Sequence, residues 1–401
     1  MIKEKVVRIT KPEKKVFLIV IDGMGERIYK DEPTALEQAS TPNMDELARM
    51  GRCGLHHFPF FISPGSAIAH WILLGQSLDN FPGRGVLEAV GYEARTGESI
   101  LKIGDLVFRA NLATVDKDLI ILDRRAGDTE YGFDVLEEEI NKIGEKYGII
   151  YRRTIGHRGV LISRIEKTLV DDVDTYKVGE KPNLDISPKV REFLLEVFSK
   201  LNNHPVNLER EKRGEKKANF LLLRGAGIYH GKSFFFTNHG ISALGISDKD
   251  LYLGVAAYLG MDTLFIEDDK KIKEALNRFD KYDFFFVHFK LSDTFGERGL
   301  KEEKVKYLEK IDGFLGELIG KEIVVCVTAD HSTPYRLKRH TSDPVPFLIY
   351  NPTMEADSVN KFTEKECRKG WYGITTTEEL FYLIMNEAGA LYPCREIGEK
   401  K

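Results

Sequence analysis

The chain has 401 residues, of which 42% are hydrophobic and 30% are charged, and its formal net charge is −4. This composition is typical of an ordered globular protein long enough for two domains, and it excludes a chain that is disordered throughout. The nearly balanced charge gives no overall attraction to nucleic acid or to an anionic membrane, so we expect neither as a partner.

The N-terminus and the cysteines bear on the compartment in which the protein works. Residues 1–5 are mostly charged and no long apolar stretch follows them, which argues against a signal peptide or a membrane span. The four cysteines are scattered without a CxxC pair, so neither a zinc ribbon nor a disulfide framework is predicted. We therefore expect a cytoplasmic protein.

The first predicted strand is the apolar run Val16–Ile21, which is followed directly by Asp22. A helix is predicted to begin at Pro42 with Thr41 as its N-cap, because proline is favoured at the first helical position and threonine just before it. The N-terminal part of the chain therefore reads as a buried strand, a polar turn and a helix.

Ser66 follows Pro64 and Gly65 and opens an apolar helical pattern. At a helix N-terminus the backbone N–H groups and the dipole favour an alkoxide or a bound phosphate, and a nearby divalent cation would lower the pKa of the hydroxyl further. The other interpretation is that Ser66 is only an N-cap, since serine is a preferred cap. His70, one turn later, either orients this site or satisfies a hydrogen bond in the core.

The middle of the chain, residues 80–225, differs from the rest. Its short strand-like runs and one charged helical stretch lie at 107–113, 119–122, 148–152, 157–162 and 188–217. We interpret this segment as a smaller α+β domain inserted into a core domain made of residues 1–79 and 226–401.

Two apolar runs in the C-terminal half also end near acids. Phe284–Phe289 leads to Asp293, and 323–328 leads to Asp330. A helical pattern between them gives the strand, helix, strand order of a parallel sheet, in which ligands gather beyond the carboxyl ends of the strands. Together with Asp22, three such ends at one crevice predict a metal site. Further buried strands are predicted at 220–223, 264–266 and 347–350.

Two clusters near these strand ends could supply metal ligands. Asp330 with the adjacent His331, and His340 nine residues on, offers the mixed oxygen and nitrogen ligands that suit Mn or Zn, whereas a lone buried histidine is usually structural. Asp293 and Glu297 are four residues apart, so on a helix both carboxylates would face one ion. The alternative for this pair is an exposed acidic turn.

Short motifs follow one another along the chain. They are Asp22-Gly-Met-Gly, Pro-Gly-Ser66, Gly83-Arg84-Gly85, Asp123-Arg124-Arg125-Ala-Gly, Gly156-His157-Arg158, His204-Pro-Val-Asn207, Arg224-Gly-Ala-Gly, Asp330-His331-Ser and Asp343-Pro-Val-Pro. In order and spacing this series resembles the archaeal-type 2,3-bisphosphoglycerate-independent phosphoglycerate mutases, which belong to the alkaline phosphatase superfamily. The resemblance covers nearly the whole chain.

The resemblance implies an α/β fold, with an alkaline phosphatase-like core in which helices sandwich a mostly parallel sheet. The inserted α+β domain would bind and cap the substrate. The implied activity interconverts 2-phosphoglycerate and 3-phosphoglycerate in glycolysis and gluconeogenesis, through a phosphoserine at Ser66 and without 2,3-bisphosphoglycerate. The implied partner is a small phosphorylated substrate, and the protein would be a monomer or a small homo-oligomer.

The resemblance also implies roles for individual residues. Two divalent metal ions would be held, one by Asp22, Ser66, Asp330 and His331, and the other by Asp293, Glu297 and His340. Candidates for binding the substrate are Arg84, Arg124, Arg125 and Arg158, and candidates for proton transfer are Asp123 and His157. Two cations can clamp both oxygens of an in-line displacement while arginines neutralise phosphate and carboxylate. For any single arginine, a structural ion pair is the alternative.

Several positions depart from the family pattern. Ala67 and Ile68 replace a polar Asp-Thr pair, Glu297 replaces a histidine, and Leu253 and Ala257 stand where a lysine and an arginine are usual. A carboxylate at 297 favours Mn or Mg over Zn. The lost cations leave two alternatives to the mutase. One is a phosphatase or phosphotransferase of the same superfamily acting on another small phosphorylated metabolite, and the other is a non-catalytic metal-binding paralogue.

Overall fold

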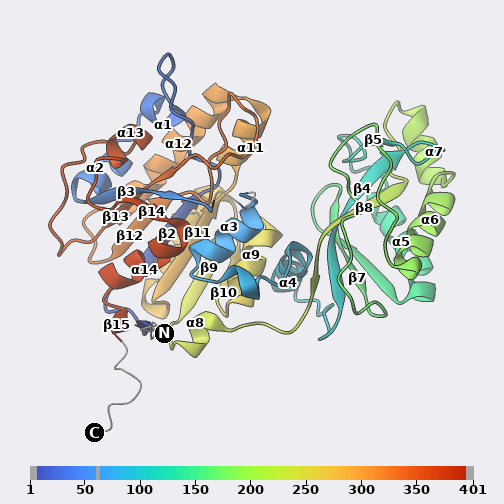
Figure 1. Ribbon diagram of the computed structural model, residues 1–401, viewed down its shortest axis with the longest axis horizontal. Helices are drawn as coiled ribbons and strands as arrows, with labels where there is room; N and C mark the ends of the chain where they lie inside the picture. Colours follow the sequence, from blue (N-terminus) through green and yellow to red (C-terminus); the bar gives the residue numbers. More distant parts are fainter. Residues whose placement is uncertain (1–6, 60–63, 394–401) are drawn as a thin grey trace, which may run out of the picture. The chain divides into compact units, whose positions relative to one another are not determined.

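The computed structural model describes residues 7–59 and 64–393 of the chain (Figure 1). Residues 1–5 and Cys394, which entered the expectations about a signal peptide and about cysteine pairing, lie outside the described residues. The chain divides into two compact units. The first comprises the chain up to Phe81 and from Ser233 onward, and the second is Pro82–Lys232.

The first unit is built on an eight-stranded sheet with the strand order β10-β9-β11-β2-β12-β13-β3-β14. In it β2 pairs in parallel with β11 and β12, whereas β13 is antiparallel to both of its neighbours. This mixed, mostly parallel sheet confirms the predicted α/β class. The strands are β2 (Val16–Ile21), β3 (Gly51–His57), β9 (Ala243–Ser247), β10 (Asp262–Phe265), β11 (Phe284–Phe289), β12 (Val324–Thr328), β13 (Val345–Tyr350) and β14 (Gly373–Thr376), and a separate pair is formed by β1 (Val7–Ile9) and β15 (Leu391–Pro393).

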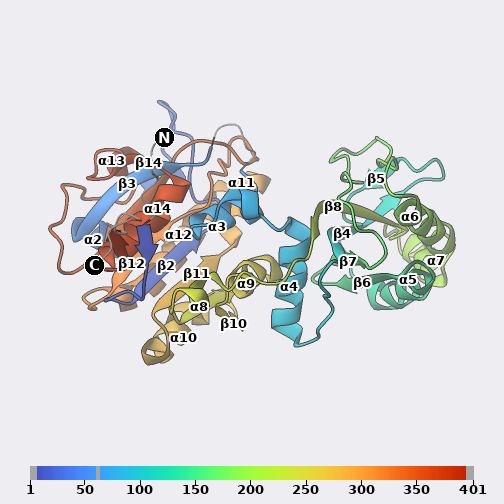
Figure 2. The same ribbon diagram turned by 60° about the horizontal axis from the view of Figure 1, so that its bottom comes forward.

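Helices cover both faces of this sheet (Figure 1 and Figure 2). On one face α1, α2, α10 and α12 enclose a single apolar core, and on the other α3 packs against α9 and α14. The helices are α1 (Ala35–Gln38), α2 (Pro42–Arg49), α3 (Ser66–Leu73), α8 (Phe235–Asn238), α9 (Asp250–Tyr258), α10 (Lys271–Asn277), α11 (Leu291–Arg298), α12 (Lys301–Leu315), α13 (Glu364–Cys367) and α14 (Thr377–Glu387), with 3-10 turns η1 (Leu78–Asn80), η2 (Asp268–Lys270), η3 (Phe279–Lys281) and η4 (Gly316–Leu318). The α2 helix begins at Pro42 as predicted, but the Thr41 side chain makes no capping hydrogen bond.

Every residue of β2, β11 and β12 is buried, which is why these strands read as unbroken apolar runs. Because the three strands are parallel neighbours, their carboxyl ends meet at one edge of the sheet. Asp22, Lys290 and the Ala329-Asp330 pair follow directly at that edge. The predicted convergence of the strand ends is therefore observed, and α12 separates β11 from β12 as expected.

Gly23 makes the turn that ends β2 possible. Its φ is +65°, in the left-handed region that side chains disfavour. A Cβ atom here would lie 2.6 Å from Thr333 Oγ1 and 2.7 Å from the Asp293 Cβ. The loops after β2 and β12 and the first turn of α11 can approach one another this closely only because residue 23 has no side chain.

The second unit is an antiparallel sheet with helices. Its strands are β4 (Leu106–Val115), β5 (Ile121–Asp123), β6 (Ile149–Arg153), β7 (Arg158–Ser163) and β8 (Phe220–Ile228), and its helices are α4 (Arg84–Thr96), α5 (Phe133–Tyr147), α6 (Pro188–Leu201) and α7 (Pro205–Lys212). The long strand β4 pairs antiparallel with β5, β7 and β8. The unit has its own apolar core, formed by this sheet with α5 and α6. The helical stretch predicted at 188–217 is in fact two helices, since Pro205 begins a new one.

Two further expectations can be compared with the described residues. Within 7–59 and 64–393, no helix combines the length and the apolar character needed to cross a membrane. Cys53, Cys326 and Cys367 are buried free thiols.

Candidate functional site

Ser66 lies at the buried start of α3. It is the first residue of the helix, and Gly65 occupies the N-cap position, so the interpretation of Ser66 as only an N-cap is wrong. Its Oγ lies 3.2 Å from Nε2 of His331. A hydroxyl in the first turn of a helix is where the helix dipole favours negative charge. This position suits a nucleophile that receives a phosphoryl group.

Asp22 is fully buried and is held by three donors. Tyr252 Oη lies 2.6 Å and His288 Nε2 lies 3.0 Å from Oδ2, while Lys290 Nζ lies 3.0 Å from Oδ1. Burial alone would raise the pKa of Asp22, but the positive charge of Lys290 and the hydrogen bond from His288 hold this pKa well below its usual range. Asp22 is therefore an anion whose two oxygens face different neighbours.

The hydrogen bonds of His331 determine which ring nitrogen can act as a ligand. Thr333 Oγ1 donates to Asp293 Oδ1 at 2.7 Å, so its 3.1 Å contact with His331 Nδ1 requires that nitrogen to carry the proton. Nε2 then has a free lone pair, 3.2 Å from Ser66 Oγ and 3.1 Å from Asp330 Oδ2. Burial lowers the pKa of His331 to about 3, so the ring is neutral. A neutral imidazole with this tautomer can bind a metal ion or accept the proton of the serine.

Asp293, Glu297 and His340 form a second group. The two acids lie one turn apart on α11, and His340 Nε2 is 3.1 Å from Asp293 Oδ1 and 3.6 Å from Glu297 Oε1. His340 Nδ1 donates to the Pro64 carbonyl at 2.8 Å. Although burial favours the neutral ring, the two carboxylates raise the pKa of His340 to about 10. Without a metal ion the ring is thus a cation that offsets part of the acidic charge.

Lys290 connects the two groups and was not predicted from the sequence. Its Nζ lies 3.0 Å from Asp22 Oδ1 and 2.6 Å from Asp293 Oδ2. Burial would lower its pKa, but Asp22 above all raises the pKa of Lys290 well above its usual value. The signal was available, because Lys290 directly follows the last residue of β11, at the same edge of the sheet as Asp22.

The donor set fits divalent cations. In each of two groups, Asp22 with Asp330 and His331, and Asp293 with His331 and His340, the ligand atoms lie within 4.8 Å of one another. Among the described residues, Asp330 Oδ2 and His340 Nε2 are buried without a hydrogen-bond partner. Burial and repulsion from Asp22 raise the pKa of Asp330 well above its usual value. A cation would both coordinate these atoms and neutralise the buried acids.

In the second unit, Glu88 on α4 is surrounded by arginines. Its Oε1 accepts from Arg84 Nε and from Arg109 Nη1, each at 2.8 Å. Burial would raise the pKa of Glu88, but Arg109 and Arg84, with a further contribution from Arg158, lower it to about 2. One carboxylate therefore faces several guanidinium groups, which leaves net positive charge.

His157, which directly precedes β7, lies in the same positive field. Burial, followed by the charges of Arg158, Arg109 and Arg125, lowers the pKa of His157 to about 3. The ring is therefore neutral, and excess positive charge around it is typical of a site for an anion. Of the predicted residues, Arg84 and Arg158 lower the pKa of Glu88, and Arg158 and Arg125 lower that of His157. Sequence reasoning missed Arg109, which is buried in β4 and reads as part of an apolar strand.

Asp123 and Arg124 are engaged elsewhere. Arg124 forms a bidentate pair with Asp174, at 3.0 and 2.6 Å, and Asp123 pairs with Lys216 at 3.1 Å. For Arg124 this is the structural ion pair that was the alternative to substrate binding.

Three of the positions that depart from the family pattern are apolar and buried. Leu253 and Ala257 lie on α9 with 1% and 7% of their surface exposed, and Ala67 on α3 is 4% exposed. The neighbouring Tyr252 points its hydroxyl to Asp22. No cationic side chain therefore reaches the site from these positions of α9.

Comparison with known families gives one match that spans most of the chain. The model of the metalloenzyme superfamily matches residues 14–387. A curated relative from Methanocaldococcus jannaschii, named 2,3-bisphosphoglycerate-independent phosphoglycerate mutase 1, is 35% identical over 94% of this chain and 97% of the relative. A relative from Pyrococcus horikoshii, named 2,3-bisphosphoglycerate-independent phosphoglycerate mutase, is 35% identical over 93% of this chain and 97% of its own.

Solved structures show the same similarity. A protein from Pyrococcus horikoshii superimposes with a TM-score of 0.80 at 29% identity, covering 96% of this chain and 99% of that one. The cofactor-independent phosphoglycerate mutase from Thermoplasma acidophilum gives a TM-score of 0.63 at 29% identity, covering 94% of this chain and all of its own. The match extends over both units of the chain in each case.

Proposed function

Because the chain belongs to the metalloenzyme superfamily and, within it, to the family of 2,3-bisphosphoglycerate-independent phosphoglycerate mutases, we propose that it interconverts 2-phosphoglycerate and 3-phosphoglycerate. The observation that supports the proposal most strongly is the position of the Ser66 hydroxyl. This hydroxyl lies at a buried helix start, 3.2 Å from the free lone pair of His331 and beside a group of metal ligands. A protein without catalytic activity has no need of a nucleophile at that place.

In this proposal Ser66 carries the phosphoryl group between two hydroxyls. The Ser66 hydroxyl gives up its proton and its Oγ attacks phosphorus, while the bond from phosphorus to the glycerate oxygen breaks and that oxygen takes up a proton to leave as a hydroxyl. The other hydroxyl of the glycerate then gives up a proton and attacks the phosphoserine, the bond from phosphorus to Oγ breaks, and Oγ takes up a proton to restore Ser66. The covalent step divides one difficult transfer into two. We assign the proton transfers to His157 and Asp123, of which Asp123 would first have to leave its ion pair with Lys216.

Two groups of residues would hold the metal ions. They are Asp22, Ser66, Asp330 and His331 for the first ion, and Asp293, Glu297 and His340 for the second. When bound, the ions would lower the pKa of the Ser66 hydroxyl and neutralise the phosphoryl oxygens. With two carboxylates and one imidazole, the second group favours Mn²⁺ or Mg²⁺ over Zn²⁺.

The arginines of the second unit would bind the phosphate and the carboxylate of the substrate. The lowered pKa values of Glu88 and His157, to which Arg84, Arg125 and Arg158 contribute, support a surplus of positive charge there. A bidentate guanidinium suits both anionic groups of a phosphoglycerate. Arg124 would join them only by leaving Asp174, so the proposal depends on it least. We place the reaction in the cytoplasm, without 2,3-bisphosphoglycerate as a cofactor.

The apolar residues at 253 and 257 favour one second candidate. With fewer cations around the substrate, the same Ser66 chemistry would suit another small phosphorylated metabolite, either as a phosphatase or as a phosphotransferase. The discriminating measurement follows 2-phosphoglycerate and free phosphate in one Mn²⁺-supplemented reaction that starts from 3-phosphoglycerate. Formation of 2-phosphoglycerate with little phosphate supports the mutase, whereas phosphate alone or no reaction contradicts it.

The Ser66→Ala variant tests the mechanism in the same assay. Loss of the covalent step is expected to lower turnover at least about a thousandfold, with the fold unchanged. Ser77→Ala, an exposed serine outside the site, is the matched control and should behave like the wild type. Turnover near the wild-type value in Ser66→Ala would contradict a phosphoserine.

A further inference from the structure

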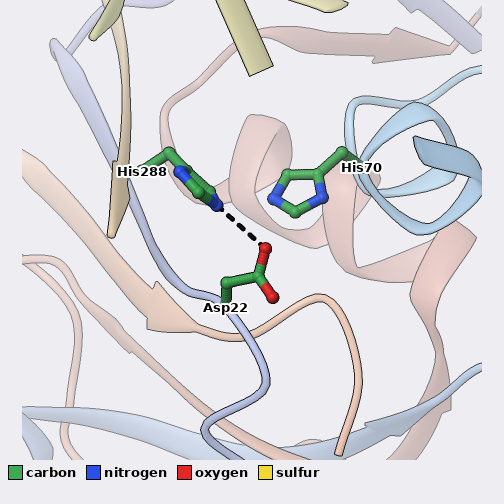
Figure 3. Close-up of side chains that lie close together, drawn as sticks. All are labelled: Asp22, His70 and His288. Carbon is green, nitrogen blue, oxygen red and sulfur yellow. Dashed lines mark hydrogen bonds and ion pairs between the residues drawn. The ribbon is translucent and has the colours of Figure 1, made fainter. Parts of the chain in front are cut away.

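A third group of ligand atoms lies beside the two groups assigned to phosphoryl transfer. It consists of Asp22 at the end of β2, His70 on α3 and His288 in β11, all fully buried, with ligand atoms within 4.8 Å of one another. Figure 3 shows that the Asp22 carboxylate faces the His288 ring and that one ring nitrogen of His70 points toward both. The proposed phosphoryl transfer uses neither histidine.

The nitrogen of His70 that faces this group has a free lone pair. His70 Nδ1 lies 2.8 Å from the carbonyl oxygen of Ser66, and because a carbonyl only accepts, Nδ1 carries the proton. The other nitrogen, Nε2, has no hydrogen-bond partner in the described part of the chain. A buried lone pair without a donor is unfavourable. A metal-binding histidine typically donates its second N–H to a carbonyl in this way.

His288 can become a ligand without changing its charge. Its Nε2 lies 3.0 Å from Asp22 Oδ2, and its Nδ1 lies 3.2 Å from Ser247 Oγ. Without a cation, Nε2 donates to the Asp22 carboxylate, which only accepts. Because the serine hydroxyl can accept as well as donate, the ring proton can move to Nδ1 when a cation takes the place of that hydrogen bond. When the proton sits on Nδ1, Nε2 is free to bind a cation.

Asp22 can serve this group and the first metal group at the same time. Its Oδ1 faces Lys290 and, at 3.8 Å, His331 Nε2, whereas Oδ2 faces His288. The Tyr252 ring stacks on His288 with 3.4 Å between ring centroids, so the third group is closed by protein on that side. A carboxylate can bridge two ions through its two oxygens.

We propose that Asp22, His70 and His288 form an additional divalent-metal site beside the two groups that would hold the catalytic ions, and that it shares Asp22 with the first of them. Two imidazole nitrogens and one carboxylate oxygen suit Zn²⁺ or Co²⁺ and suit Mg²⁺ poorly. The ion fixes Asp22 through Oδ2 and satisfies the free lone pair of His70. It thereby positions a residue of the first metal group without contacting the substrate.

The test measures metal binding directly and uses no substrate, so its result is independent of the proposed reaction. Metal-free full-length protein is titrated with Co²⁺ alone, and bound metal per chain is measured by elemental analysis together with the visible absorption of Co²⁺. The wild type is compared with His70→Gln and His288→Gln. His340→Gln, which removes a nitrogen from the second group, is the matched control.

Both His70→Gln and His288→Gln should bind one equivalent of Co²⁺ fewer than the wild type, whereas His340→Gln should keep the absorption band that these two variants lose. Wild-type stoichiometry and absorption in both variants would overturn the proposal. If the variants do not fold, anomalous diffraction from wild-type crystals soaked in Co²⁺ decides. A peak between the three side chains supports the site, and no peak there overturns it.

Discussion

At the scale of single residues, the chemistry of the site depends on which nitrogen of each histidine carries the proton. Thr333 fixes the proton of His331 on Nδ1 and thereby turns a lone pair toward Ser66. The Pro64 carbonyl accepts from Nδ1 of His340, so Nε2 of that ring faces Asp293 and Glu297. Thr333 is itself oriented by Asp293, 40 residues away, and Pro64 lies 276 residues from His340, so sequence spacing predicted candidate ligands but could not orient them.

Glu297 is the residue whose role departs most from the family pattern. Glu297→Ala is expected to weaken the binding of one of two Mn²⁺ ions by about tenfold or more, because it removes a carboxylate 3.6 Å from His340 Nε2. Isothermal titration of metal-free protein with Mn²⁺ measures this. The exposed Glu303→Ala on α12 controls for the loss of one surface charge. Equal affinities in the two variants would show that Glu297 is not a ligand.

Glu364 makes the stability of the protein depend on pH. It is buried at the start of α13, where it accepts hydrogen bonds from the Glu26 N–H and, at 2.7 Å, from the Thr34 hydroxyl. Burial, with a smaller contribution from the charge of Glu26, raises the pKa of Glu364 to about 7. The folded protein therefore retains a proton that the unfolded chain, with an ordinary pKa of about 4.3, has already released.

Since the folded state binds more protons in this window, the free energy of unfolding falls as pH rises from about 4.5 to about 7, by up to about 3 kcal/mol from this residue. In Glu364→Gln the decrease should be smaller by that amount. Urea unfolding at several pH values measures it, with the exposed Glu355→Gln as control. If the free energy of unfolding fell equally with pH in the wild type and in Glu364→Gln, the raised pKa of Glu364 would be contradicted.

At the scale of secondary-structure elements, the sequence was sufficient for the strands that carry the site. The runs before Asp22, Asp293 and Asp330 are apolar because those strands are buried on both faces. Other features needed tertiary contacts. The break at Pro205 lies inside a charged stretch whose pattern predicts one helix. The pattern around Arg109 predicts only a strand, and its ion pair with Glu88 of α4 is visible only in the structure.

Lys304 on α12 connects the two loops that carry candidate metal ligands. Its fully buried Nζ donates to the carbonyls of Gly23 and Thr333, each at 3.0 Å, and forms an ion pair with Glu26. One carbonyl follows Asp22 and the other lies two residues after His331. Lys304 thus fixes the positions of the two loops relative to each other.

We expect Lys304→Met to lower the free energy of unfolding by about 3 kcal/mol or more, because it leaves the Glu26 carboxylate buried and unpaired. Adding Glu26→Gln should recover part of this loss, and a double-mutant cycle from urea unfolding separates the pair from the carbonyl contacts. A change below about 1 kcal/mol in Lys304→Met would mean that the ammonium is not needed to join the loops.

At the scale of the whole molecule, each of the two units has a large apolar core of its own, and in the described part of the chain these two cores share no strand. All partners of β4, β5, β6, β7 and β8 lie within Pro82–Lys232, and the apolar core of this unit draws only on residues of that segment. The α4 helix also packs on β4 and β8 of the same unit. The sequence analysis predicted an inserted domain at 80–225, and the second compact unit of the structure is Pro82–Lys232.

The second unit should therefore fold without the first. A fragment of residues 82–232 is long enough to bury a core of its own, and β4 and β8 pair its two ends in antiparallel register. We expect one cooperative urea transition with a free energy of unfolding of at least about 5 kcal/mol, and well-dispersed amide resonances. Leu112→Ala, which removes a fully buried side chain from β4, should lower that value by about 2–5 kcal/mol. A fragment that shows no cooperative transition would mean that the inserted unit needs the metal-binding unit to fold, and that its arginines cannot be arranged independently of Ser66.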